Sequence, residues 1–241
     1  MNDNNQKYPT GWVEESSFGV WFLRTDIWIY HVLTLSLDSL EKLLTPRDTS
    51  YPVILDVGCG HGNSLVELDR RFSPTKIIGV DVDPNALTWS KGNREKCRCD
   101  VEIVIDNAAT MNIADQSVDM VFCHQTFHHI VDQDNAIKEF YRVLKPGGVL
   151  LFAESCKRYI HSFIIKALFR HPMDVQKTDE EYLELITGAG FTYQAENVSK
   201  PFLWWSRADL GLLGKIGWMS AKDKKETREE TLVYLAAYRP K

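Results

Sequence analysis

The side chains best suited to chemistry in this chain are carboxylates and histidines that follow short apolar segments. Asp81 and Glu154 each end such a segment, while His124 ends another, with His128 and His129 close behind. A carboxylate can accept hydrogen bonds from two adjacent hydroxyl groups, which suits a ribose. A histidine can move a proton near neutral pH, because its ordinary pKa lies there. The pattern therefore indicates a site that binds a ribose-containing ligand and handles a proton.

A glycine-rich turn provides the frame for these residues. Residues 53–57 are apolar except for one aspartate and read as a strand that is buried on both faces. Gly58, Gly60 and Gly62 follow, so the chain can turn tightly and a ligand can approach its backbone. A helical pattern comes next. A strand, a glycine turn and a helix in this order form a ligand site at the carboxyl end of a parallel sheet.

The glycine spacing distinguishes two classes of nucleotide-binding protein. A dinucleotide fingerprint has its third glycine at the sixth position, where this chain has Asn63. The GxGxG found here, preceded by Asp56, resembles the first motif of class I S-adenosylmethionine-dependent methyltransferases. Other motifs similar to those of this family follow in order over residues 53–153. The resemblance implies a methyltransferase that uses S-adenosylmethionine and releases S-adenosylhomocysteine.

The resemblance also implies the fold. The expected fold is α/β, a doubly wound, mostly parallel seven-stranded sheet in the order 3-2-1-4-5-7-6. Its last strand is antiparallel, and helices cover both faces. Apolar segments agree with strands after the first one, at residues 76–81, 101–105, 119–123, 149–153, 191–198 and 231–238. We expect a tail and helical cap over residues 1–48, and the methyltransferase domain over 49–241 with 199–229 as a lid-like insertion.

The resemblance implies roles for individual residues. The backbone of residues 58–62 would hold the methionine end of the cofactor, Asp81 its ribose, and Asn107 with Ala108 its adenine. The family commonly has an acid at the position of Asn107, so Asp106 remains the alternative. The full set of expected cofactor-binding residues is Asp56, Gly58, Cys59, Gly60, Gly62, Asp81, Val82, Asn107, Ala108 and His124.

The segment His-Gln-Thr-Phe-His-His-Ile at 124–130 resembles a stretch that many small-molecule methyltransferases carry after their fourth strand. We expect His124 or His128 to be catalytic, with His124 facing the transferred methyl group or a histidine removing a proton from the acceptor. The alternative is that His128 and His129 are structural residues that open the next helix. Glu154 is either a second base, a ligand for a substrate amine, or a solvated carboxylate.

Aromatic residues are concentrated in two segments, 12–30 and 199–229. A helical pattern covers residues 25–44, and its aromatic side chains either pack as core or roof the ligand pocket. Arg24 and His31 are the polar residues of interest there. An apolar roof favours a small methyl acceptor that is itself apolar or aromatic.

Further local patterns predict helix boundaries. Ser64 with Glu67, and residues 178–181, read as capping boxes. Asp132 or Asp134 can begin another helix. Residues 159–170 read as one apolar helix whose buried face includes Phe163.

Composition excludes several classes of protein. The formal net charge of −5 argues against a nucleic-acid target, which needs a basic surface. The five cysteines are an odd number, and Cys97 and Cys99 are too close for a usual zinc pair, so we expect reduced thiols and no metal. No apolar run reaches the ~18–20 residues of a membrane span. Residues 1–7 lack the apolar core of a signal peptide, and we expect a cytoplasmic protein.

Two other functions remain open from the residues alone. A dinucleotide-dependent oxidoreductase conflicts with Asn63. A scaffold protein that binds S-adenosylmethionine without transferring a methyl group fits the same motifs, since a fold does not guarantee an activity. The sequence does not identify the acceptor atom or the oligomeric state.

Overall fold

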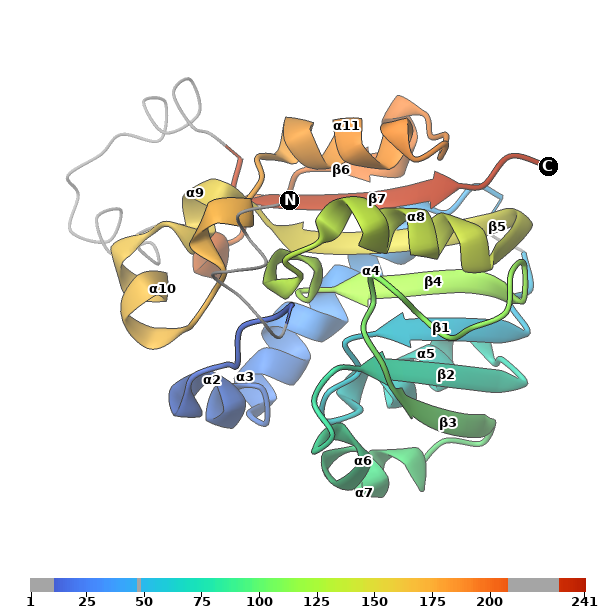
Figure 1. The fold of residues 1–241 in the computed structure, drawn as a ribbon, viewed down its shortest axis with the longest axis horizontal. Helices are drawn as coiled ribbons and strands as arrows, with labels where there is room; N and C mark the ends of the chain where they lie inside the picture. Colours follow the sequence, from blue (N-terminus) through green and yellow to red (C-terminus); the bar gives the residue numbers. More distant parts are fainter. Residues whose placement is uncertain (1–10, 47–48, 208–229) are drawn as a thin grey trace.

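The structure, a computed structural model, describes residues 11–46, 49–207 and 230–241. Its centre is a seven-stranded sheet in the order β3-β2-β1-β4-β5-β7-β6 (Figure 1). The strands from β1 to β5 pair in parallel, and β7 runs antiparallel to both β5 and β6. The predicted strand order and antiparallel last strand are confirmed. The strands are β1 Val53–Val57, β2 Lys76–Asp81, β3 Asp100–Ile105, β4 Val118–His124, β5 Leu144–Ser155, β6 Val198–Ser199 and β7 Leu232–Tyr238.

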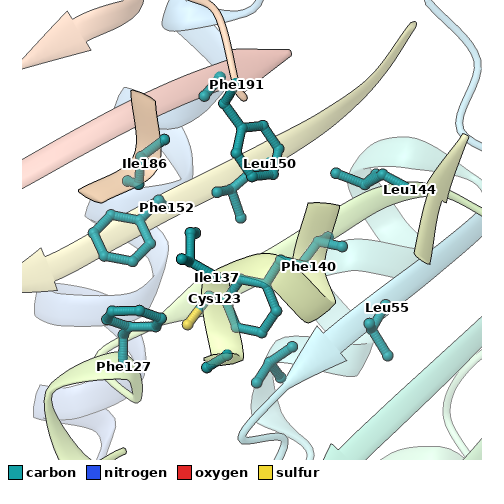
Figure 2. Packing of buried hydrophobic residues seen from close by; sticks show 14 of the residues in the cluster. Leu55, Cys123, Phe127, Ile137, Phe140, Leu144, Leu150, Phe152, Ile186 and Phe191 are labelled. Atoms are coloured by element: carbon teal, nitrogen blue, oxygen red, sulfur yellow. The ribbon is translucent and has the colours of Figure 1, made fainter. Parts of the chain in front are cut away.

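Helices cover both faces of the sheet, which is why the central strands are apolar on both sides. One face packs against α8 (Gln133–Val143) and α11 (Asp179–Gly188), and Figure 2 shows part of this cluster. The other face packs against α4 (Leu35–Leu43) and α5 (Asn63–Phe72). Alternate residues of β1 and β5 enter the two clusters, as the pleat of a strand requires.

Short helices complete the described part of the chain. Helices α6 (Ala86–Trp89) and α7 (Lys91–Arg94) follow β2. Helices α9 (Lys157–Ile160) and α10 (Phe163–Leu168) follow β5. Single 3-10 turns occur at Phe127–His129, Met173–Val175, Ala195–Asn197 and Trp204–Ser206. None of the helices in the described residues has the length and apolar character to cross a membrane.

The N-terminal segment is helical over the predicted range, but it is not one regular helix. It consists of α2 (Ser17–Phe22), α3 (Asp26–Trp28), a π-helical turn at Ile29–Thr34 and then α4. Such π turns often occur near functional sites. The boundary expected at residue 48 stays a prediction. Most of the expected lid lies outside the described residues, because 208–229 are not part of them.

Helix boundaries were predicted correctly at two of the three capping sites. The Thr178–Glu181 capping box begins α11, and Asp132 caps α8. The box predicted from Ser64 is wrong, because α5 begins after Gly62 without a side-chain cap. The Ser64 hydroxyl instead donates to Asp56 Oδ2 at 2.5 Å. A buried carboxylate needs a hydrogen-bond donor, and Ser64 meets that need.

The helix predicted over 159–170 is divided into α9 and α10. Ser162 interrupts it, because its side chain caps α10 by accepting a hydrogen bond from Ile165 N. Phe163, which we expected to be buried, has an exposed fraction of 86%. The break rotates α10 relative to the predicted helix, so the apolar periodicity over the whole segment gave the wrong face.

The strand predicted over 191–198 is also wrong. Only Val198–Ser199 forms β6, and a 3-10 turn at Ala195–Asn197 precedes it. The buried Asn197 side chain explains the turn. It accepts a hydrogen bond from Gln194 N at 2.8 Å and donates to Leu43 O at 2.8 Å. These bonds tie the segment to the end of α4.

Candidate active site

A cavity of about 570 Å³ lies at the carboxyl ends of β1, β2, β3 and β4, the usual ligand site of this type of sheet. A smaller cavity of about 90 Å³ adjoins it and shares the glycine turn as a wall. The larger cavity collects six of the ten expected cofactor-binding residues, Gly58, Gly60, Asp81, Val82, Asn107 and Ala108. Asp56, Cys59 and His124 line the smaller cavity, together with Gly58 and Gly60. Gly62 lines neither cavity and instead precedes α5.

The glycine turn is fixed against β2. Gly58 has φ +75°, and a Cβ atom there would lie 2.2 Å from Thr126 Oγ1. Gly60 N donates to Asp81 Oδ2 at 2.8 Å, so the turn and the second strand hold each other. Only glycine combines this backbone conformation with so close an approach at position 58. The turn therefore presents bare backbone to the cavity.

Asp81 lines the larger cavity at the end of β2. Its second oxygen, Oδ1, accepts a hydrogen bond from Asp83 N at 3.0 Å. Each carboxylate oxygen keeps another lone pair that can accept from a hydroxyl group. Burial raises the pKa of Asp81 above its ordinary value, and the two backbone N–H groups oppose that rise.

Asp106 and Asn107 make different hydrogen bonds. One carboxylate oxygen of Asp106 accepts a hydrogen bond from Asn107 N at 2.8 Å, and the other accepts one from Asn112 N at 2.7 Å. Asp106 therefore acts as a turn residue. Asn107 Oδ1 accepts from Ala109 N at 2.9 Å and retains a second lone pair. Both side chains line the larger cavity, and both retain an oxygen lone pair that can accept a hydrogen bond, so both remain candidates for the adenine contact.

Asp56 and His124 are two of the polar residues that line the smaller cavity. Burial raises the pKa of Asp56 to about 7, although the hydrogen bond from Ser64 opposes this rise. The ring of His124 lies 5.7 Å from that of Trp28 and 5.9 Å from that of Phe122. Burial, assisted by His128, lowers the pKa of His124 to about 3. His124 is therefore a neutral imidazole away from the larger cavity.

His128 and Glu154 form a buried pair at the floor of the larger cavity. His128 Nδ1 lies 2.6 Å from Glu154 Oε2. Glu154 is fully buried, and its other oxygen accepts from Thr126 N and Phe127 N, each at 2.8 Å. The solvated alternative for Glu154 is wrong. It orients His128 and fixes the loop after β4.

Two further residues beside this pair had no signal in the sequence. His171 lies between α10 and the next 3-10 turn, and its ring is 5.1 Å from that of His128 and 4.7 Å from that of His129. Burial, with His128, lowers the pKa of His171 to about 2. Glu15 reaches the same place, with Oε2 at 3.9 Å from His129 Nε2. They are distant in the chain and meet only in the fold.

The opposite wall of the cavity is apolar. Phe169 packs against Phe18 at 5.5 Å and Phe22 at 5.8 Å between ring centroids. Other large apolar residues that line the cavity include Trp12, Trp28, Ile160, Ile164, Ile165, Leu168 and Trp205. Aromatic residues of the N-terminal segment thus roof the cavity. Among the described residues, neither lysine nor arginine lines it.

Two hydrogen bonds fasten the N-terminal segment to the glycine turn and the start of α5. Arg24 Nε donates to His61 Nε2 at 2.7 Å, and Asn63 Nδ2 donates to Leu23 O at 3.1 Å. Both partners belong to the glycine turn and the start of α5. His31, the other polar residue of interest, lines the cavity and is exposed.

Comparisons with known proteins agree with this geometry. Residues 55–152 match the family model described as a methyltransferase domain. Phosphoethanolamine N-methyltransferase 1 from Zea mays is 31% identical over 104 residues, which cover 43% of this chain and 21% of that protein. A fatty-acid O-methyltransferase from Mycolicibacterium smegmatis is 27% identical over 135 residues, covering 56% of this chain and 48% of that protein.

The chain therefore spans about a fifth of the maize relative and about half of the mycobacterial one. Among solved structures, the plantazolicin methyltransferase BamL, a complex that includes S-adenosylhomocysteine, superposes with a TM-score of 0.64. It is 16% identical, over 93% of this chain and 90% of that one. This likeness supports the fold. The domain match over residues 55–152, together with the observed strand order, identifies a methyltransferase domain of the class I S-adenosylmethionine-dependent type within this chain.

Proposed function

We propose that this protein transfers a methyl group from S-adenosylmethionine to a small, apolar or aromatic molecule. The observation that carries the proposal is one continuous cavity, in which the family's cofactor positions lie on one side and an aromatic wall on the other. The histidines at its floor add a polar group where the two sides meet.

The residues present fit the cofactor. The bare backbone of Gly58 and Gly60 would hold its methionine end, and Asp81 would accept hydrogen bonds from its ribose. Asn107, with Val82 and Ala108, would meet the adenine. Asp56 adds a buried carboxyl group beside the glycine turn, and a positively charged ligand would favour its ionised form. When bound, S-adenosylmethionine provides the electrophilic methyl group, so the protein has to align the acceptor and exclude water.

The lining of the cavity supports an apolar acceptor over a phosphorylated one. Phosphate groups are usually held by arginine, lysine or a helix N-terminus, and no described cationic side chain lines the cavity. The roof formed by Phe18, Phe22 and Phe169 instead suits an alkyl chain or an aromatic ring. A fatty acid or phenol fits this lining better than phosphoethanolamine.

His128 is the better candidate for handling the acceptor's proton. Glu154 holds its Nδ1 and leaves Nε2 as the free ring nitrogen, an arrangement that fixes one tautomer. His124 is the weaker candidate, because its ring lines the smaller cavity and its pKa is lowered to about 3. A base works best when its pKa lies near the working pH.

Two broader features belong to the proposal. The net charge of −5 supports a small-molecule acceptor over a nucleic acid. All five cysteines are free thiols, which supports a reducing, cytoplasmic location.

The test is a methyl-transfer assay with labelled S-adenosylmethionine and three acceptors, a long-chain fatty acid, a simple phenol and phosphoethanolamine. The proposal predicts labelled product from the fatty acid or the phenol, and a loss of product when Phe169 is replaced by aspartate, which places a charge in the roof. Transfer to phosphoethanolamine alone would contradict it. Cofactor binding without transfer to any acceptor of a wider apolar panel would favour the non-catalytic binding protein.

A further inference from the structure

Three histidines gather at the floor of the larger cavity. His128 and His129 follow β4, and His171 comes from the segment after α10. Each offers one ring nitrogen, and these three nitrogens lie within 4.8 Å of one another. The spacing of the cysteines predicts no metal site, whereas this group joins two adjacent histidines to a third from a distant segment.

The ring nitrogens of these histidines have the unshared electron pairs that a metal ion needs from its ligands. Glu154 takes His128 Nδ1, which leaves Nε2 as the ring nitrogen that His128 can offer to a ligand. His171 Nδ1 is buried and has no hydrogen-bond partner within the described part of the chain. Imidazole nitrogens with unshared electron pairs that lie this close together favour a cation between them.

The carboxylates around the group resemble the outer shell of a metal site. A metal-bound histidine usually donates its second N–H to a carboxylate, which orients the ring. Glu154 is the carboxylate in this position beside His128. Glu15 lies on the other side, with Oε2 at 3.9 Å from His129 Nε2. Its Oε1 accepts from Arg170 N at 3.0 Å, next to His171, so Glu15 joins the N-terminal segment to the third histidine.

We propose that His128, His129 and His171 bind a divalent transition-metal ion of the zinc type, which leaves one coordination position open to the cavity. Three imidazoles suit zinc, and a site with three protein ligands keeps a fourth position for a small molecule. Tetrahedral zinc would require the three nitrogens to lie about 3.3 Å apart, so the rings close inward by at most ~1.5 Å. An oxygen of the acceptor can occupy the open position.

Metal binding by the three histidines does not depend on the protein's proposed methyl-transfer activity. With a metal bound, Nε2 of His128 is a ligand, and the metal faces the acceptor in place of the free imidazole. The metal site does not rest on the proposed acceptor, and its test does not use the methyl-transfer assay.

The test uses the full-length protein after removal of metals with a chelator. Co2+ is added as a spectroscopic substitute for zinc, and visible absorption and calorimetry give the geometry and the stoichiometry. The variants are His129→Gln and His171→Gln, with His161→Gln as the matched control. His161 bonds to Met173 O and does not line the cavity. Circular dichroism and thermal melts establish that each variant folds.

The proposal predicts one Co2+ per chain with the intense visible bands of a tetrahedral site. It predicts binding at least ~10-fold weaker in the two cluster variants and unchanged in His161→Gln, and azide should shift the bands by taking the open position. Wild-type binding no tighter than that of folded His171→Gln would overturn the site. So would thiolate charge-transfer bands that persist in this variant, since they would assign the metal to cysteines. Bands insensitive to azide would overturn the open position.

Discussion

Glu154 is expected to contribute most of its stabilisation through its three shortest hydrogen bonds in the core. Its Oε1 accepts from two backbone N–H groups at 2.8 Å, and its Oε2 lies 2.6 Å from His128 Nδ1. Glu154→Gln keeps the shape of the side chain but removes the charge, and it sets an amide NH2 against a ring N–H.

The magnitude follows from the number of bonds. A hydrogen bond to a charged group contributes about 1.5–3 kcal/mol and a neutral one about 1 kcal/mol, so each of three bonds loses roughly 1 kcal/mol. We expect Glu154→Gln to lower the free energy of unfolding by ~3 kcal/mol. The matched control is Glu184→Gln on α11, where the side chain is exposed and the expected change is within ~0.5 kcal/mol.

The assay is urea unfolding at neutral pH, with NMR of the His128 ring as the second readout. In the wild type, Nδ1 should carry the proton, and in Glu154→Gln this preference should be lost. A loss of stability no larger than that of Glu184→Gln, or an unchanged tautomer, would refute the role assigned to Glu154.

Two further predictions concern the glycine turn and its neighbour. Because burial raises the pKa of Asp56 from 3.8 to about 7, the unfolded chain ionises this group first as pH rises, and stability falls between about pH 4 and pH 7. Asp56→Asn removes this dependence, so its free energy of unfolding relative to wild type should increase by up to about 4 kcal/mol between pH 4 and pH 8, as measured with urea; equal slopes for the two proteins would contradict the prediction. Gly58→Ala should lower stability by ~1–3 kcal/mol and weaken cofactor binding, because its Cβ would lie 2.2 Å from Thr126 Oγ1 in a left-handed backbone. Thermal melts and calorimetry measure both effects, and Gly92→Ala, where nothing lies within 4 Å, is the control.

Local patterns predicted the central part of the fold well. The strand before Gly58 and the strand ending at Asp81 are both where the apolar runs indicated. Such segments are determined by their own residues, because a parallel strand with both faces covered must be apolar throughout. The side of the cavity that we propose for the cofactor comes from the ends of these strands, so its residues were predictable.

The predictions that were wrong or missing concern segments whose conformation depends on contacts with residues distant in the chain. Asn197 bonds to Leu43 and turns the chain where apolar residues indicated a strand. Ser162 divides a helix whose periodicity looked continuous. His171 and Glu15 have no motif around them, and only the fold brings them to His128. No pattern within one segment reveals a group assembled from three.

The central claim is that the cavity binds S-adenosylmethionine through Asp81, and calorimetric titration tests it most directly. The ligands are S-adenosylmethionine, S-adenosylhomocysteine and NAD, and the proteins are wild type, Asp81→Ala and the exposed control Asp134→Ala. The account predicts roughly micromolar binding of both adenosyl ligands and none of NAD. It predicts a loss of at least ~10-fold, about 1.4 kcal/mol, in Asp81→Ala alone. No binding of either adenosyl ligand, or equal affinity in Asp81→Ala and Asp134→Ala, would contradict it.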